Sequence, residues 1–147
     1  MKAREVRQKV LDEHTELRGM LDQMRPLVDR FEDGDDGVGS ELRERALALY
    51  ARFESHLDFE DQFLTPALRA GGPDGNRHAD HLAHEHREQR ELLSYLLSRF
   101  EQRSQPTLLV AREFRNFSEY LRLDMQHEEV TLLTDAALRT GAGDDAD

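Results

Sequence analysis

The sequence contains no cysteine and no tryptophan in its 147 residues. Without cysteine, disulfides, thiolate zinc sites, iron–sulfur clusters and cysteine nucleophiles are excluded. Carboxylate oxygens and imidazole nitrogens are then the only strong metal donors that the side chains offer. Valine and isoleucine are also scarce, whereas Leu, Ala, Glu and Arg dominate, and these are good helix formers. The composition therefore predicts an all-α protein.

Long apolar runs and an excess of basic residues are also missing. No run approaches the roughly 20 apolar residues of a membrane span, and residues 1–10 are too charged for a secretory signal, which predicts a cytoplasmic protein. The formal net charge of -11 repels phosphate backbones and anionic lipid headgroups. We therefore expect neither nucleic acid nor membrane as a partner, and a monomer or weak homodimer.

Three breaks rich in Gly, Pro or Asp, at residues 33–39, 71–76 and 104–106, divide the chain. The segments between them repeat apolar residues at spacings of three and four, which is typical of amphipathic helices. This pattern predicts one domain over residues 1–140, an antiparallel up-down-up-down four-helix bundle, followed by a flexible acidic tail over 141–147. Pro26 and Pro66 should kink or end their helices, and Pro106 should lie in a first turn.

The expected core follows from the apolar stripe of each segment. We call this stripe the seam of the helix. The expected core residues are Val10, Leu17, Leu21, Met24 and Val28; Leu42, Ala46, Leu49, Phe53, Phe63 and Ala67; Leu82, Leu93, Leu96 and Phe100; and Val110, Phe114, Phe117 and Leu121.

Polar residues interrupt every one of these seams. They lie early in the first and third segments and late in the second and fourth, so an antiparallel bundle brings them into one layer. Burying so many ionisable groups without a partner would cost more than a domain can tolerate, and a cation removes the difficulty. The sequence therefore predicts a buried metal site. The residues that interrupt the seams are His14; His56 and Glu60; His86 and Gln89; and Asp124 and Glu128, of which all but Gln89 are candidate metal ligands.

Two other interpretations of this layer remain open. A single histidine in a seam is usually a hydrogen-bonded core residue, and a salt-bridged polar layer without metal is also conceivable. An internal repeat favours metal, because residues 11–21 align with 83–93 and residues 56–64 with 124–132. Two similar helical hairpins bring two half-sites together, which favours a two-metal centre.

Residues 12–18, 56–68, 85–88 and 127–129 resemble the hemerythrin-like (HHE cation-binding) family. The most specific part is His-x-x-x-Glu followed by Leu-x-Pro-Ala-Leu over residues 56–68. The resemblance implies a four-helix bundle with an oxo- or hydroxo-bridged di-iron centre. It also implies a role in binding oxygen, sensing iron or oxygen, or handling peroxide or nitric oxide.

The resemblance also implies particular ligands. His14, His56, Glu60, His86 and Glu128 match the family's ligand positions, with Glu60 and Glu128 as the bridging carboxylates.

The sequence departs from the family's oxygen carriers at Leu82 and Asp124, where those proteins have histidines. The carboxylate-rich set that results favours ferric iron and argues against stable reversible oxygen carriage. His127, next to Glu128, is a further candidate ligand, and His81 and His84 flank the site.

Three more residues could orient the ligands rather than bind metal. They are Gln89, Glu13 and Glu85, although surface placement is the simpler expectation for the two glutamates.

The leading hypothesis is a protein with two iron ions per chain that acts on dioxygen, peroxide or nitric oxide, or in iron homeostasis. Zinc and manganese are alternative metals. If the protein is an enzyme, the metal pair would decompose peroxide or act as an oxidase. The alternatives are a non-catalytic sensor or binding module that responds to metal or oxygen, and a structural bundle with zinc or no metal.

Overall fold

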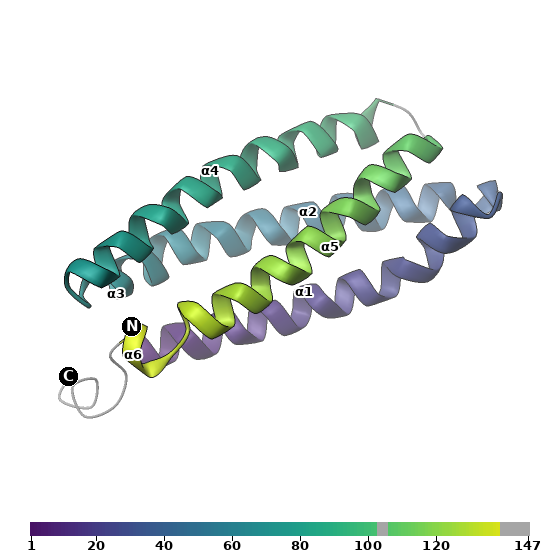
Figure 1. The fold of residues 1–147 in the computed structure, drawn as a ribbon. Coiled ribbons are helices and arrows are strands. Elements are labelled where there is room, and N and C mark those ends of the chain that lie inside the picture. The colour runs from purple at the N-terminus through teal and green to yellow at the C-terminus, as the bar shows by residue number, and fades with distance from the viewer. Residues whose placement is uncertain (103–105, 139–147) are drawn as a thin grey trace.

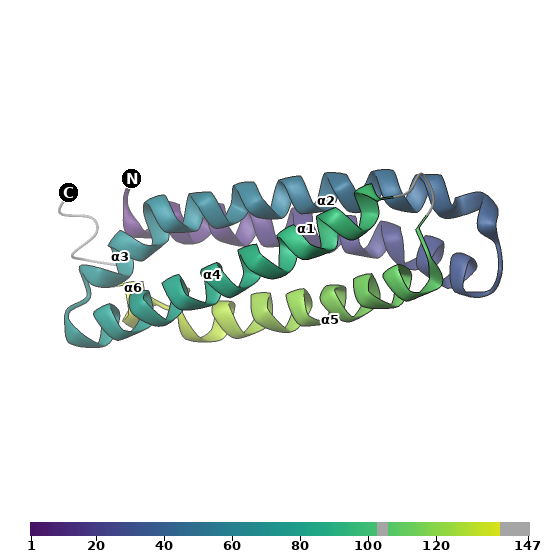
Figure 2. The same ribbon diagram turned by 90° about the horizontal axis from the view of Figure 1, so that it is seen from above.

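The computed structural model describes residues 1–102 and 106–138, and in this part of the chain every regular element is a helix. The prediction of an all-helical protein is confirmed. Four long helices lie side by side along the molecule (Figures 1 and 2). They are α1 (Ala3–Glu32), α2 (Gly39–Phe59), α4 (Pro73–Glu101) and α5 (Leu108–Thr131). The shorter elements are η1 (Asp36–Val38), η2 (Glu60–Leu64), α3 (Thr65–Arg69) and α6 (Asp135–Leu138).

Within the described ranges, no helix combines the length and apolar character needed to cross a membrane. The predicted tail over 141–147 and two residues of the third predicted break, Ser104 and Gln105, lie outside the described residues.

The helix ends differ from the predicted breaks in small ways. α4 begins at Pro73, inside the second predicted break, after Gly72 turns the chain with φ 90°. Proline suits this first helical position, because its missing N–H would have no partner there. Pro106 precedes Thr107, the N-cap of α5, whose hydroxyl accepts a hydrogen bond from the Val110 N–H at 3.2 Å. Pro26 does not end α1, which continues to Glu32.

The second predicted helix contains one wide turn, η2, which is π-helical. Here the N–H of Thr65 donates to the carbonyl of Glu60, five residues back. Pro66 follows directly, and its ring disfavours the close approach of a carbonyl four residues back, which favours the wider turn.

The wide turn changes which residues reach the core. A π turn uses more residues than an α turn, so positions after it face about one residue later than α-helical spacing predicts. Leu64 and Leu68 are buried, whereas Phe63 and Ala67 are only partly buried. The prediction that Phe63 and Ala67 are core residues is therefore wrong, and the other predicted core residues are buried.

The apolar core is divided into two clusters. One follows the length of the bundle from Leu17 to Met125, and the other lies at the end where α3 and α6 pack against α1 and α4. Each long helix crosses from one cluster to the other at a polar residue. The crossings are at His14 between Val10 and Leu17, Glu60 between Leu57 and Leu64, His86 between Leu82 and Leu93, and Glu128 between Met125 and Leu132.

Candidate metal centre

The polar layer between the two apolar clusters is closed to solvent. In the described part of the chain, the buried polar side chains are Glu13, His14, His56, Glu60, His86, Gln89 and Glu128, each at most 4% exposed. Four of them form a compact group. Donor atoms of His14, His56, Glu60 and Glu128 all lie within 4.8 Å of one another. Burial of this kind is tolerated only where the groups have partners or a cation.

The three buried histidines present the same nitrogen to the two central carboxylates. Nε2 of His14 lies 3.1 Å from Oε1 of Glu128. Nε2 of His56 lies 3.1 Å and Nε2 of His86 lies 3.3 Å from Oε1 of Glu60. The three imidazoles come from α1, α2 and α4, and the carboxylates from η2 and α5. Every long helix, counting η2 as the continuation of α2, therefore contributes to one centre.

The opposite nitrogen of each histidine, Nδ1, contacts a different carboxylate. A carboxylate accepts only, so each Nδ1 donates its proton to it, and with a metal bound each Nε2 would offer its lone pair to the ion. The three contacts are His14 to Glu129 at 2.7 Å, His56 to Glu13 at 2.8 Å and His86 to Asp61 at 2.6 Å.

An arginine holds each of these outer carboxylates. Each arginine lies four residues from its histidine on the same helix, so the two side chains share a helix face. The pairs are Arg18 with Glu129 at 2.8 and 2.9 Å, Arg52 with Glu13 at 3.1 Å and Arg90 with Asp61 at 2.7 Å.

Several buried atoms of the centre have no hydrogen-bond partner among the described residues. They include Nε2 of His14 and His86, Oε2 of Glu60 and Oε1 of Glu128. A buried polar atom without a partner costs roughly 1–3 kcal/mol. Unpartnered imidazole nitrogens and carboxylate oxygens are donor types that first-row metals accept. The residues present therefore fit a metal cation.

The two central carboxylates have opposite electrostatic environments. Burial and the negative charge of Glu60 raise the pKa of Glu128 well above its usual range. Burial would also raise the pKa of Glu60, but the charge of His56 and hydrogen bonds to its neighbours outweigh this effect and hold it well below the usual range. A cation between them would relieve the repulsion that the pair otherwise carries.

The histidines also differ from one another. Burial and the nearby charge of His56 lower the pKa of His14. Burial would lower the pKa of His56 as well, but the charge of Glu60 and the hydrogen bond to Glu13 raise it to about 9. Burial would lower the pKa of His86 too, but Glu60 and Asp61 raise it, so in the metal-free state His56 and His86 favour the charged form and His14 the neutral one.

Other residues predicted from the sequence lie outside the compact group. Asp124 lies at the edge of the α5 seam, where Met125 takes the buried position, and its carboxylate accepts a hydrogen bond from Nε2 of Gln89 at 3.0 Å. His127 is exposed and is not brought into the compact group. His81 and His84 are exposed and pair with Glu85 at 2.8 Å and Glu88 at 3.0 Å.

Sequence reasoning missed Asp61, Glu129 and the three arginines, and it favoured a surface position for Glu13. One signal was present in the internal repeat, in which Arg18 aligns with Arg90 just as His14 aligns with His86. The carboxylates Asp61 and Glu129 also align with each other in the repeat, but each contacts a histidine on another helix, so the repeat alone does not assign their partners.

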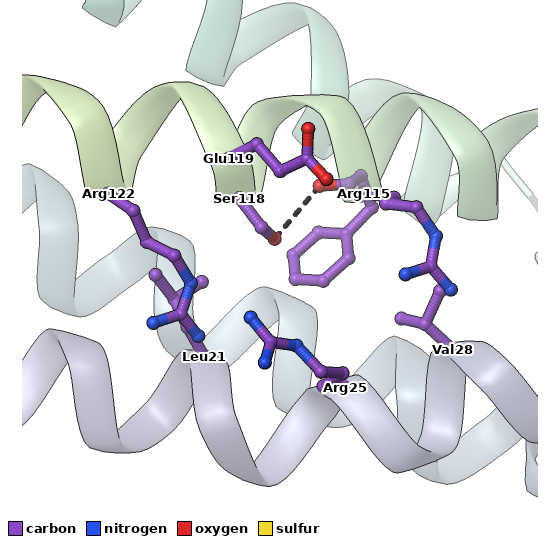
Figure 3. Close-up of a pocket in the computed structure, with 8 residues that line it drawn as sticks. Leu21, Arg25, Val28, Arg115, Ser118, Glu119 and Arg122 are labelled. Carbon is purple, nitrogen blue, oxygen red and sulfur yellow. Dashed lines mark hydrogen bonds between the residues drawn. The ribbon is translucent and has the colours of Figure 1, made fainter.

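A separate cavity of about 40 Å³ lies between α1 and α5 (Figure 3). Arg25, Arg115 and Arg122 surround it, and no predicted metal ligand lines it. Three guanidinium groups face a single carboxylate there, that of Glu119, so the net positive lining repels a cation and this cavity is a poor metal site.

Comparison with known proteins gives one match. The family model described as the hemerythrin HHE cation binding domain matches residues 6–136. No curated protein and no solved structure matches the chain. The matched range contains every histidine and carboxylate of the buried layer.

Proposed function

The chain belongs to the hemerythrin HHE cation-binding family, and from this premise we propose that it is a non-haem iron protein with two iron ions in the buried centre. The observation that carries the proposal is the convergence of three Nε2 atoms on two carboxylates whose donor atoms lie within 4.8 Å of each other, with unpartnered atoms on both carboxylates. The ligands would be His14, His56, His86, Glu60 and Glu128. Asp124 at the edge of the group would be the sixth.

The donor set supports two ions rather than one. Structural zinc sites use four ligands, often cysteines, and this centre offers more donors and no thiolate. Two carboxylates this close together suit a pair of cations that share them. The hard, anionic donors favour iron or manganese in a high oxidation state.

A pair of iron ions would supply redox chemistry toward dioxygen, peroxide or nitric oxide. The protein's own residues would hold the imidazoles in one tautomer, through Glu13, Asp61 and Glu129. The apolar clusters on both sides would keep bulk water from the centre. Among the described residues of the buried layer, the one ionisable group that is not a proposed ligand is Glu13, which is held behind His56 by Arg52, so any turnover would depend on the metals.

The proposal includes the finer fold class, an antiparallel up-down-up-down four-helix bundle in one domain over residues 1–140. Contacts of α1 with α2 and α5, and of α4 with α2 and α5, support this arrangement. We further propose a cytoplasmic location, which the acidic charge of the chain supports. Small molecules are the proposed partners, because the centre is buried.

The first test is metal analysis of protein expressed in iron-replete cells, together with its optical spectrum. We expect about two irons per chain and near-ultraviolet absorption from an oxo bridge. A His56→Ala variant should lose iron, and a His84→Ala variant, changed at an exposed histidine, should keep it. One zinc per chain, or no metal in an intact fold, would contradict the proposal.

Turnover separates an enzyme from a sensor. The iron-loaded protein would be mixed with hydrogen peroxide, and peroxide loss would be followed over many equivalents. Loss that continues beyond two equivalents per centre and disappears in His56→Ala would indicate an enzyme. A single stoichiometric spectral change without turnover would indicate a sensor or binding module.

A further inference from the structure

A second cavity lies between α4 and α5, directly beside the buried centre. Its volume is about 230 Å³, and Glu128, one of the two central carboxylates, forms part of its wall. Glu128 is 4% exposed, and its Oε1 atom has no hydrogen-bond partner among the described residues. The cavity and the centre therefore share a carboxylate.

The lining of this cavity has the chemistry of a cation site. It contains three imidazoles and three carboxylates, and none of the described residues that line it is lysine or arginine, although the chain has 20 of these. The cavity between α1 and α5 shows the contrast, because three arginines surround it (Figure 3). The lining residues are His78, His81, Glu85, Asp124, His127, Glu128, Thr131 and Leu132.

The ligand-type residues lie at helical spacing on two facing helices. His78, His81 and Glu85 follow one another on one face of α4, and Asp124, His127 and Glu128 do so on α5. His81 already contacts Glu85 at 2.8 Å, and its imidazole is two-thirds exposed. Exposed side chains of this kind can turn toward an ion at little cost.

The cavity continues toward the end of the bundle. A neighbouring cavity of about 300 Å³ shares His78 and Thr131 with it and extends to Gly71 and Ala137, near α6. Asp74 and His78 line this neighbouring cavity, so carboxylate and imidazole groups are found from this end of the bundle to Glu128 at the buried centre.

We propose that His81, Glu85 and His127 form an outer cation site in this cavity, from which a first-row divalent cation passes to Asp124 and Glu128 and into the buried centre. This inference rests on the proposed function of the centre as a metal site. The outer site gives a role to two histidines that the buried centre does not use, His81 and His127.

The outer site has a kinetic role. Its ligands are solvated and mobile, so water competes for the ion and the site binds more weakly than the buried centre. A cavity lined by charges of one sign raises the local concentration of the opposite ion and speeds its capture. Loss of the outer ligands should therefore slow loading without changing the final occupancy of the centre.

The test uses the metal-free full chain and Co²⁺ alone, which reports its coordination through visible absorption. We expect the double variant His81→Ala/His127→Ala to load the buried centre about tenfold more slowly at low cobalt in stopped-flow measurements. Its final content in the buried centre should equal that of the wild type. In an equilibrium titration, the wild type should bind a second cobalt ion more weakly than the first, and the double variant should lack this second ion. The matched control is His84→Ala, on the same helix but outside the cavity lining, which should load at the wild-type rate.

Loading of the double variant at the wild-type rate, with its fold intact by circular dichroism, would overturn the outer site. Failure of the proposed function looks different. In that case the wild type holds no cobalt at the buried residues, and His56→Ala changes nothing. The outer site is then tested by the weakly bound cobalt ion alone. This ion must be absent in His81→Ala/His127→Ala and present in His84→Ala.

Discussion

Nδ1 of His56 lies 2.8 Å from Oε1 of Glu13, a buried carboxylate on α1 that is 43 residues away in the sequence. The same relationship joins His14 to Glu129 and His86 to Asp61. Each contact holds a proton on Nδ1 and directs Nε2 toward the centre, where it can coordinate a metal. The three ligands of the proposed metal centre are therefore oriented by the protein itself.

Replacing the carboxylate behind His56 should weaken metal binding. Glu13→Gln keeps the shape but removes the charge that strengthens the Nδ1 hydrogen bond. We expect a loss of metal affinity of about tenfold or more, measured by competition with a chelator. Glu16→Gln is the matched control, because Glu16 also contacts Arg52, at 3.0 Å, but is exposed and makes no contact with the histidine. Equal affinities of the two variants would contradict the orienting role.

Glu128→Gln should have opposite effects on stability and on metal binding. Burial and the charge of Glu60 make the Glu128 carboxylate unfavourable in the metal-free protein. We therefore expect the neutral amide to raise the free energy of unfolding of the metal-free protein at pH 8 by roughly 1 kcal/mol. Metal affinity should fall at the same time. Urea denaturation and metal titration measure the two effects, with Glu119→Gln, an exposed position on α5, as the control.

Stability of the metal-free protein should fall as pH rises through the range set by His56. Its folded-state pKa of about 9 lies above the ordinary 6.5, so protonation of this residue stabilises the folded state. The contribution is fully present below about pH 6.5 and is lost as pH rises through 9, with a size of about 3 kcal/mol. Urea denaturation between pH 6 and pH 10 should show this decrease, and His56→Gln should reduce it. The His84→Gln control should show the same decrease of the free energy of unfolding with pH as the wild type. The same decrease in His56→Gln would refute the assignment of this effect to His56.

The wide turn predicts an inverted order for two neighbouring core substitutions. Leu64 is fully buried and Phe63 only partly, although the seam predicted from the sequence continues from Glu60 to Phe63. We expect Leu64→Ala to lower the free energy of unfolding by about 3 kcal/mol. Phe63→Ala should cost less, despite the larger side chain. Urea denaturation of both variants checks this, and a larger loss in Phe63→Ala would contradict the burial order of these two residues.

The sequence by itself determined the helices and the polar layer. Helical periodicity is a local property, so the apolar spacing along each segment located the seams and showed where His14, Glu60, His86 and Glu128 interrupt them. The absence of cysteine and the internal repeat then narrowed the chemistry to imidazole and carboxylate ligands. These features need no knowledge of how the helices are rotated against one another.

The tertiary structure alone decided the details that depend on helix rotation and axial offset. The wide turn at η2 moved Leu64 and Leu68 into the core in place of Phe63 and Ala67, and Met125 took the buried position beside Asp124. Glu129 meets His14 across 115 residues, a distance in sequence at which no local pattern operates. A contact of 2–3 Å between helices depends on rotations of a few tens of degrees, and only packing fixes those rotations.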